Sequence, residues 1–564
     1  MKKIVYFIAV CVMSLMVSCE ELTDVNINPN GVDPQTVDPN LMMAQFMSST
    51  MTSYLERGFN DKCAGVSQYV QRSGWSSGVN RFDWISAEDW SADYARLKNI
   101  QHFYNRAEEL EYEMHQGIGL VMRSFIFGLL TDKFGDVPFR EALSPVSGGT
   151  NIRPAFAPQE EVYKGIIEDL KQANTLLSKS SVEHYTGVPA SKATDLFYGF
   201  DPVKWRKLTN SLLLRYYMRL SVKLPDYAQA GIKEIVNNPS QYPIFASNGD
   251  DALMAYLGTG TGDSWPGNAV FDNSNPPSFG RVQLCAGLRD VLLDFNDPRL
   301  ACWFNKVVMQ IAIDEDPSLP DNYDKIVDGV RHLSRSFLTK NDMAIYNKAT
   351  WVADRAAGKT LIDTMKYVGI PVAQAVHEGV YYNLNPVTDQ GSSNVHVSAL
   401  ADIYKAAKGD LLKARMITYA EVCFILAEAA QKGWTSGAKE WYEKGVKASL
   451  DYWKLGNQYD SYIQNSGVAF NSAKAQEQII TQKWIANWTM GVESWCDWRR
   501  TGFPKFQFGS AGVRNTMPLR FRYDVNEKNR NLKNYEDAVS KLVETGQSGP
   551  EGKDSAWSKI WLIQ

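Results

Sequence analysis

The chain has 564 residues, which is long enough for one large domain or several ordinary ones. Its 59 lysines and arginines nearly balance its 63 aspartates and glutamates, so the formal net charge of −4 indicates no broad basic surface for nucleic acid. The six histidines show no HxxxH or HExxH spacing and the cysteines form no CxxC pair, so the sequence predicts neither a metal centre nor another cofactor.

Residues 1–18 have the features of a secretory signal peptide, with two lysines before an apolar stretch that is short for a membrane-spanning helix. Ser18 stands before Cys19 in an arrangement typical of bacterial lipoprotein signals, so we expect cleavage there and lipidation of Cys19. An ordinary secretory signal with a cleavage site nearby is the alternative. Residues 19–40 are rich in Asn, Pro and Asp, which predicts an extended tether.

Apolar residues recur at three- and four-residue steps along much of the following chain, which predicts amphipathic helices. The expected helices are 41–56, 62–72, 87–115, 117–133, 159–177 and 203–223. The sequence FGDVPF, which begins at Phe134, is expected to end the fourth of these helices. Because the helices come in pairs at irregular spacing, they predict degenerate tetratricopeptide-like repeats.

Between about residues 240 and 400, Gly, Asn, Asp and Pro become frequent, which predicts a large loop-rich, irregular region. Loops carried by a rigid scaffold commonly supply recognition surfaces, so we expect this region to face a ligand.

Helical periodicity returns over 411–504. The first predicted helix carries an apolar stripe from Leu412 to Ala430 and has Gly433 as its C-cap. A second helix follows at 438–454, and the third segment, 477–504, contains four tryptophans. Taken together, the elements predict an all-α fold of tetratricopeptide-like helical repeats, forming a single domain over 41–564.

Several of these segments resemble the SusD/RagB family of surface lipoproteins. YAEVCFILAEAAQKG, the run from QKWIANW to WCDWRRTGFP, and MPLRFRYDVNEKNRN are similar to the C-terminal half of that family. The resemblance extends upstream to TDKFGDVPF, YKGIIEDLKQA and KWRKLTNSLLLRYYMRLS, and so covers nearly all of the mature chain. It implies a SusD-like fold and an outer-membrane protein that is anchored by the lipid on Cys19 and faces the cell exterior.

The resemblance also implies a function in nutrient uptake. A protein of this family captures a nutrient and delivers it to a SusC-like, TonB-dependent transporter barrel, with the helical repeats facing the transporter. The expected ligand is a glycan in the form of an oligosaccharide. A peptide, as handled by RagB-like members, is the first alternative, and a structural or adhesive subunit without a small ligand is the second.

A sugar-binding surface needs flat aromatic rings beside amide, carboxylate or guanidinium groups. This mixture occurs after the second predicted helix and again in the loop-rich region. The candidate ligand-binding residues are Trp75, Asn80, Arg81, Trp84, Trp265, Phe271, Tyr381 and Tyr382. Each ring could instead pack in the core, and Asn80 and Arg81 could simply close a turn.

No pattern in the sequence predicts catalysis. A glycoside hydrolase needs two carboxylates across a cleft, and nothing distinguishes adjacent acidic residues such as Glu88 and Asp89, or Asp250 and Asp251. No nucleophile elbow or phosphate-binding loop is present. We therefore expect a binding protein rather than an enzyme, and we expect the cysteines after Cys19 to be buried free thiols, with one disulfide as the alternative.

Overall fold

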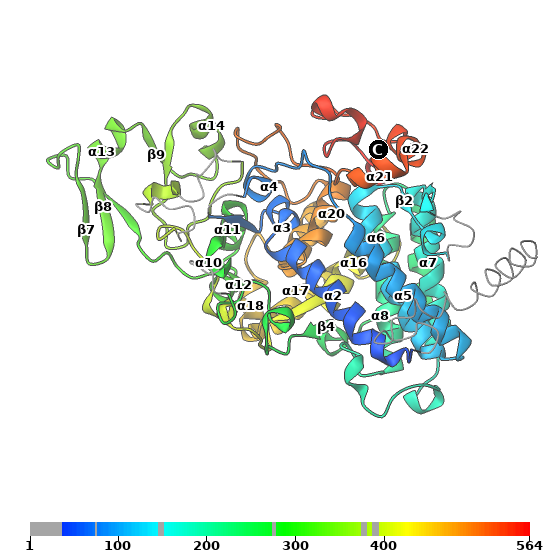
Figure 1. Ribbon diagram of the computed structural model, residues 1–564. Coiled ribbons are helices and arrows are strands. Elements are labelled where there is room, and N and C mark those ends of the chain that lie inside the picture. The colour runs from blue at the N-terminus through cyan, green and yellow to red at the C-terminus, as the bar shows by residue number, and fades with distance from the viewer. Residues whose placement is uncertain (1–36, 74–75, 145–151, 273–277, 374–380, 386–393) are drawn as a thin grey trace, which may run out of the picture.

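The computed structural model shows a helical body with a smaller lobe of short strands beside it (Figure 1). The structure describes residues 37–73, 76–144, 152–272, 278–373, 381–385 and 394–564. The predicted signal peptide, the predicted lipidation site at Cys19 and the candidate residue Trp75 lie outside these ranges. Within them, no helix is both long enough and apolar enough to cross a membrane.

The first half of the helical body is a row of helices that pack on their neighbours in sequence. Its members are α2 (Asn40–Phe59), α3 (Lys62–Val66), α5 (Ser91–Glu109), α6 (Glu113–Phe134), α7 (Gln159–Leu176), α8 (Pro202–Arg219) and α9 (Pro225–Asn237). Helix α6 is apolar on most faces, and it is accordingly buried between α5 and α7. It ends at Phe134 as predicted, because Gly135 follows with φ +94°.

The second half of the body contains the predicted antiparallel pair and the tryptophan-rich segment. Its main helices are α16 (Tyr419–Gln431), α17 (Ala438–Tyr452), α19 (Ala475–Ala486) and α20 (Gly491–Thr501). Helix α16 packs on α17 and α19, and contacts of α8 with α16 and of α2 with α20 join the two halves. Gly433 follows α16 with φ +75°, as its predicted role as a C-cap requires. The predicted all-α fold of helical repeats is therefore confirmed.

The prediction of one helix over 62–72 is wrong at its C-terminal end. Helix α3 stops at Val66, and Gln68 then adopts φ +53°, a conformation that a helix cannot contain. The remaining residues form strand β1 (Val70–Arg72), which pairs antiparallel with β5 (Val282–Leu284). This pairing brings the loop-rich region against the first helices.

Two other predicted helices are each divided in two. The segment 87–115 forms α5 and the start of α6, because Glu111 turns the chain with φ +57°. The tryptophan-rich segment 477–504 forms α19 and α20, which are separated at Thr489 with φ +75°. Periodicity alone did not reveal these breaks, because apolar residues continue across each of them.

The loop-rich region carries small sheets that the sequence analysis did not predict. One is a three-stranded sheet in the order β6-β8-β7, and the other is a parallel pair of β9 and β10. These strands are β6 (Ile311–Asp314), β7 (Asp324–Val327), β8 (Val330–Ser334), β9 (Met343–Ile345) and β10 (Thr360–Ile362). They form a lobe that projects from the helical body on the left of Figure 1 and has small apolar clusters of its own. Each strand has at most five residues, too few for a clear alternating pattern.

A short sheet also stands where the helix that begins at Leu412 was predicted. Strand β11 (Lys413–Ile417) pairs antiparallel with β4 (Ala252–Ala255), and α16 begins only after it. Just before β4, the buried carboxylate of Asp251 accepts a hydrogen bond of 2.6 Å from the backbone N–H of Tyr419. Burial raises the pKa of Asp251 to about 7, although this hydrogen bond and the charge of Arg415 oppose the rise.

Because Asp251 titrates higher in the folded chain than in the unfolded chain, folding takes up a proton between about pH 4 and pH 7. Its contribution to stability is therefore present at low pH and is lost as the pH rises through this range. We expect the Asp251→Asn variant to gain stability relative to the wild type over that range, by at most about 1.4 kcal/mol per pH unit. Urea unfolding at several pH values measures this difference. The exposed Asp460→Asn variant should follow the wild-type pH profile, and parallel profiles for Asp251→Asn and the wild type would contradict the assignment.

Candidate functional site

A cavity of about 340 Å³ opens beside α11 (Ala286–Asp294), where the lobe meets the helical body. We call it the first cavity. Its other walls are formed by the segments 346–351 and 504–507, by residues 371–372, and by Gln68 and Trp484. Its aromatic lining residues are Tyr346, Trp351, Trp484 and Phe506. The volume is within the range of pockets that hold small ligands.

Glutamine side chains join the walls of the first cavity to one another. Gln68 donates a hydrogen bond of 2.7 Å to the backbone carbonyl of Gln507. The side-chain amide of Gln507 donates to the backbone carbonyl of Lys348 at 2.8 Å and accepts a hydrogen bond from the indole N–H of Trp351. Three segments that are far apart in the sequence are thereby fixed around one space.

The wall formed by α11 is held by a buried arginine. Arg289 donates to Asp290 and to Asp363, with both N···O distances at 2.6 Å. Its guanidinium also lies over the ring of Tyr346, 4.6 Å from the centroid, and the hydroxyl of Tyr346 donates to Asp290 at 2.6 Å. These contacts fix the orientation of Tyr346 at the cavity wall.

Two lysines bring positive charge to the first cavity. Lys348 pairs with Asp294, with N···O distances of 2.5 and 2.6 Å. Lys505 is exposed, and its ammonium lies 4.4 Å from the centroid of the Phe503 ring. In the part of the chain that the structure describes, no carboxylate lies within ion-pair distance of Lys505. The first cavity therefore combines aromatic rings, amides, carboxylates and an ammonium group, which together can bind the apolar faces and the hydroxyls of a sugar.

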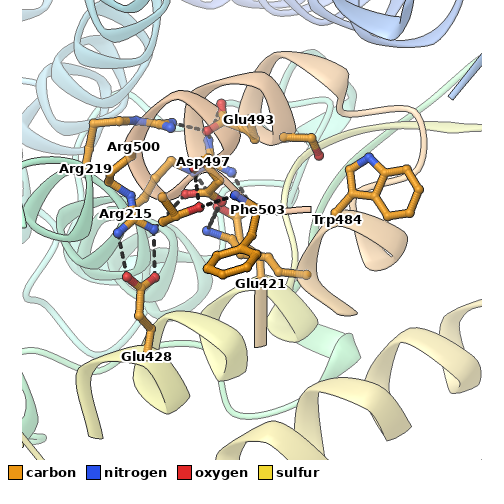
Figure 2. A network of polar contacts seen from close by, with 12 residues as sticks. Arg215, Arg219, Glu421, Glu428, Trp484, Glu493, Asp497, Arg500 and Phe503 are labelled. Carbon is orange, nitrogen blue, oxygen red and sulfur yellow. Dashed lines mark hydrogen bonds and ion pairs between the residues drawn. The ribbon is translucent and has the colours of Figure 1, made fainter. Parts of the chain in front are cut away.

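A buried network of charged side chains supports the wall that contains Trp484 (Figure 2). Arg215 of α8 forms a bidentate pair with Glu421 of α16, at 2.8 and 2.7 Å, and it also lies 3.4 Å from Glu493 of α20. Arg219 forms a second ion pair with Glu493. Burial acts to raise the pKa of Glu493, but the guanidinium groups of Arg215 and Arg219 outweigh it and hold this pKa below its ordinary value.

The same network continues to the end of α20. Arg500 pairs with Glu428, at 2.5 and 2.7 Å, and with Asp497 at 2.9 Å. Lys483, the residue before Trp484, pairs with Asp497 at 2.8 Å. The network thus ties α19 and α20 to α8 and α16, and it fixes the two places from which Trp484 and the segment 504–507 reach the first cavity.

Comparison with known proteins identifies the family. Residues 30–524 match the SusD-like family that is described as starch-binding and associating with the outer membrane. The chain belongs to the SusD-like family. No curated protein matches it.

Solved structures show the same SusD-like fold over almost the whole chain. A SusD homologue from Bacteroides fragilis is 20% identical, with a TM-score of 0.68 over 94% of this chain and 100% of the other. A chitin-binding protein is 22% identical, with a TM-score of 0.67 over 94% and 100%. A chitin-binding SusD homologue from Flavobacterium johnsoniae is 19% identical, with a TM-score of 0.64 over 93% and 98%. At these identities, the likeness establishes the fold.

In this SusD-like protein, two of the candidate residues hold a turn next to the first cavity. The side-chain amide of Asn80 bonds to the backbone N–H and carbonyl of Arg72, at 2.8 and 2.7 Å. The backbone carbonyl of Asn80 accepts a hydrogen bond of 2.8 Å from Ala373, which follows the cavity-lining residue Val372. Arg81 donates to the carbonyl of Ala511 at 2.8 Å. Both side chains therefore stabilise the local chain path.

Three of the candidate rings are buried in the structure. Trp84 stacks on Phe521 with centroids 4.5 Å apart, and its indole N–H donates to the carbonyl of Gly78. Trp265 lies against Phe59. Tyr382 is also buried, whereas Phe271 is partly buried and Tyr381 is 46% exposed. Of the candidate rings that the structure describes, those of Phe271 and Tyr381 have exposed surface.

Acidic residues considered for catalysis have other partners. Glu88 pairs with Lys62 at 2.7 Å, and Asp250 pairs with Lys207 at 2.9 Å. Across the described ranges, no group of three or more His, Cys, Asp or Glu side chains could hold a metal ion. The predicted buried free thiols are found at Cys63, Cys285, Cys423 and Cys496, and Cys302 is a partly buried free thiol.

None of the candidate residues that the structure describes lines the first cavity. The available signal was the segment FPKFQF, which follows Gly502 at the end of α20 and contains three rings with a lysine and a glutamine between them. Phe506 and Gln507 belong to this segment. The other walls come from segments whose proximity depends on tertiary contacts.

Proposed function

We propose that this protein is a non-catalytic, lipid-anchored outer-membrane protein that binds an oligosaccharide in the first cavity. It would be anchored through Cys19, face the cell exterior, and deliver its ligand to a SusC-like, TonB-dependent barrel. Membership of a family described as starch-binding and associating with the outer membrane supports this proposal. The chitin-binding proteins that share its fold favour a glycan over a peptide.

The observation that carries the proposal is the composition of the first cavity. Rings from separate segments lie beside two glutamine amides and charged groups, and the hydrogen bonds of Gln68 and Gln507 fix these segments in place. A preformed site of this kind loses little conformational freedom when a ligand binds. Hydroxyl groups of a sugar can pair with the amides and charges while its C–H faces contact the rings. Phe271, Tyr381 and the segment of Trp75, Asn80 and Arg81 remain proposed contributors to the ligand-facing surface.

Removal of one cavity ring should weaken sugar binding strongly. Phe506 is partly buried, and its ring packs edge-on against Trp484, with centroids 5.6 Å apart. We expect the Phe506→Ala variant to bind its oligosaccharide about fivefold more weakly, because one ring contact is worth about 1 kcal/mol. The measurement is a tryptophan-fluorescence titration with maltooligosaccharides and chitooligosaccharides, since Trp484 and Trp351 line the cavity.

The matched control is Phe197→Ala, which removes a partly buried ring that packs on Trp205 away from the cavity. This variant should keep the wild-type affinity. A saturable response of the wild type to peptides alone would place the protein with RagB-like peptide binders. An unchanged affinity of Phe506→Ala for its sugar would exclude the first cavity as the site.

Isolation of the protein from native membranes without a barrel partner would contradict delivery to a transporter.

A further inference from the structure

A second cavity of about 340 Å³ adjoins the first one. It lies between α11 and α19, and the segment 466–471 closes one side. Val291, Pro504 and Lys505 line both cavities and therefore form the ridge between them. The two cavities lie side by side along α11, and we call them together the groove.

We propose that the second cavity is a further sugar-binding subsite, so that the ligand is an extended oligosaccharide that crosses the ridge and occupies both cavities. This inference rests on the proposed function, because it adds units to the sugar held in the first cavity. A ligand of one or two sugar units would fill only one of the cavities.

The second cavity has the chemistry that a sugar subsite requires. The partly buried ring of Phe295 lines it beside Gly467, and a side chain at Gly467 would collide with this ring, since a Cβ there would lie 2.6 Å from a ring carbon. Lys474 and Glu477 are exposed on the opposite wall, and neither forms an ion pair with another described residue. The ring can contact the apolar C–H face of a sugar, and the two charged groups can bind its hydroxyls.

The walls of the second cavity are fixed before a ligand arrives. Gln478 accepts a hydrogen bond of 2.7 Å from the backbone of Asn471 and donates one of 2.9 Å to the carbonyl of Ala469. Gln482 donates to the hydroxyl of Tyr462 at 2.9 Å. These contacts hold the segment 466–471 against α19, so this subsite is also formed before a ligand binds.

The ridge between the cavities supports one continuous ligand rather than two separate ones. Val291 contributes an apolar surface on one side, and Pro504 with Lys505 contributes the other. The ammonium of Lys505 has no carboxylate partner among the described residues and lies at the junction, where it can donate hydrogen bonds to sugar oxygens. An oligosaccharide that crosses the ridge would accept hydrogen bonds from this ammonium group.

The test is to block the second cavity and to compare short and long sugars. The Glu477→Trp variant places a large side chain in it from an exposed position, and the matched control is Glu536→Trp, an exposed glutamate on α22 (Leu532–Ser540). Calorimetric titrations use maltooligosaccharides and chitooligosaccharides from the disaccharide to the hexasaccharide. For the wild type we expect affinity to rise with length. For Glu477→Trp we expect at least a tenfold loss for the hexasaccharide and an unchanged affinity for the disaccharide, whereas Glu536→Trp should match the wild type.

The result separates this inference from the proposed function. If the wild type binds a sugar series with an affinity that does not depend on length, or if Glu477→Trp weakens short and long sugars equally, the second subsite is excluded while sugar binding stands. If the wild type binds no sugar of either series, the proposed function and the subsite both fail. Circular dichroism of each variant verifies that its helices are intact.

Discussion

The Arg215→Met variant is expected to lose about 3–5 kcal/mol of unfolding free energy. Arg215 is almost fully buried, and its removal would leave Glu421 and Glu493 charged in the interior with one cation fewer. Methionine fills a similar space, so most of the lost unfolding free energy comes from the unpaired charge and little of it from an empty cavity. Guanidinium-induced unfolding followed by circular dichroism measures it.

An exposed ion pair provides the matched control. Lys533 and Asp537 lie 3.1 Å apart on α22, with side chains that are 85% and 63% exposed. The Lys533→Met variant should therefore change the unfolding free energy by no more than about 0.5 kcal/mol. Similar effects of the two substitutions would show that the buried network contributes no more than a surface pair. The double variant Arg215→Met, Glu421→Gln should lose less than the sum of the single variants, because the two residues act as one unit.

The Gly491→Ala variant is the second change with a large expected effect. Gly491 begins α20 where it contacts α2, and an added Cβ would lie 2.7 Å from the carbonyl oxygen of Gly58 and 2.9 Å from that of Cys63. These are backbone atoms, so neither can move aside as a flexible side chain would. We expect a loss of about 1–3 kcal/mol, although alanine favours helix formation more than glycine does. Thermal unfolding measures the shift.

Gly546→Ala is the control for this effect, because no atom lies within 4 Å of the position that its Cβ would take. It should leave the melting temperature unchanged. If the Gly491→Ala variant has the melting temperature of the wild type, α2 and α20 can move apart with little loss of free energy. That outcome would also mean that the contact between α2 and α20 does little to join the two halves of the body.

Helices with a continuous apolar stripe were predictable from the sequence almost to the residue. The segment 159–177 was predicted as a helix, and α7 covers Gln159–Leu176. Its stripe is regular because one face packs on the body and the other faces solvent. The breaks at Glu111 and Thr489 were not predictable, because neither residue type is characteristic of a positive φ.

The candidate site was harder to predict, because an aromatic residue in a loop can either pack in the core or contact a ligand at the surface. Trp84 and Trp265 lie outside the long helices, yet both are buried against residues from distant parts of the chain. Trp84, for example, stacks on Phe521. Whether a ring in an irregular segment faces solvent or core depends on tertiary contacts, and no local pattern carries that information. The groove beside α11 arises from the same kind of long-range contact.

The hydrogen bond from Gln68 to Gln507 joins residues that are 439 positions apart, and it fixes two walls of the groove. Contacts of such long range form late, because the entropy of closing the intervening loop must first be overcome. During synthesis, the residues of the N-terminal wall are therefore made well before their partner leaves the ribosome, and no product that ends before Gln507 can complete the groove. Ligand binding would consequently favour the native chain over every partly folded form in which these two walls are apart, since the site needs both of them.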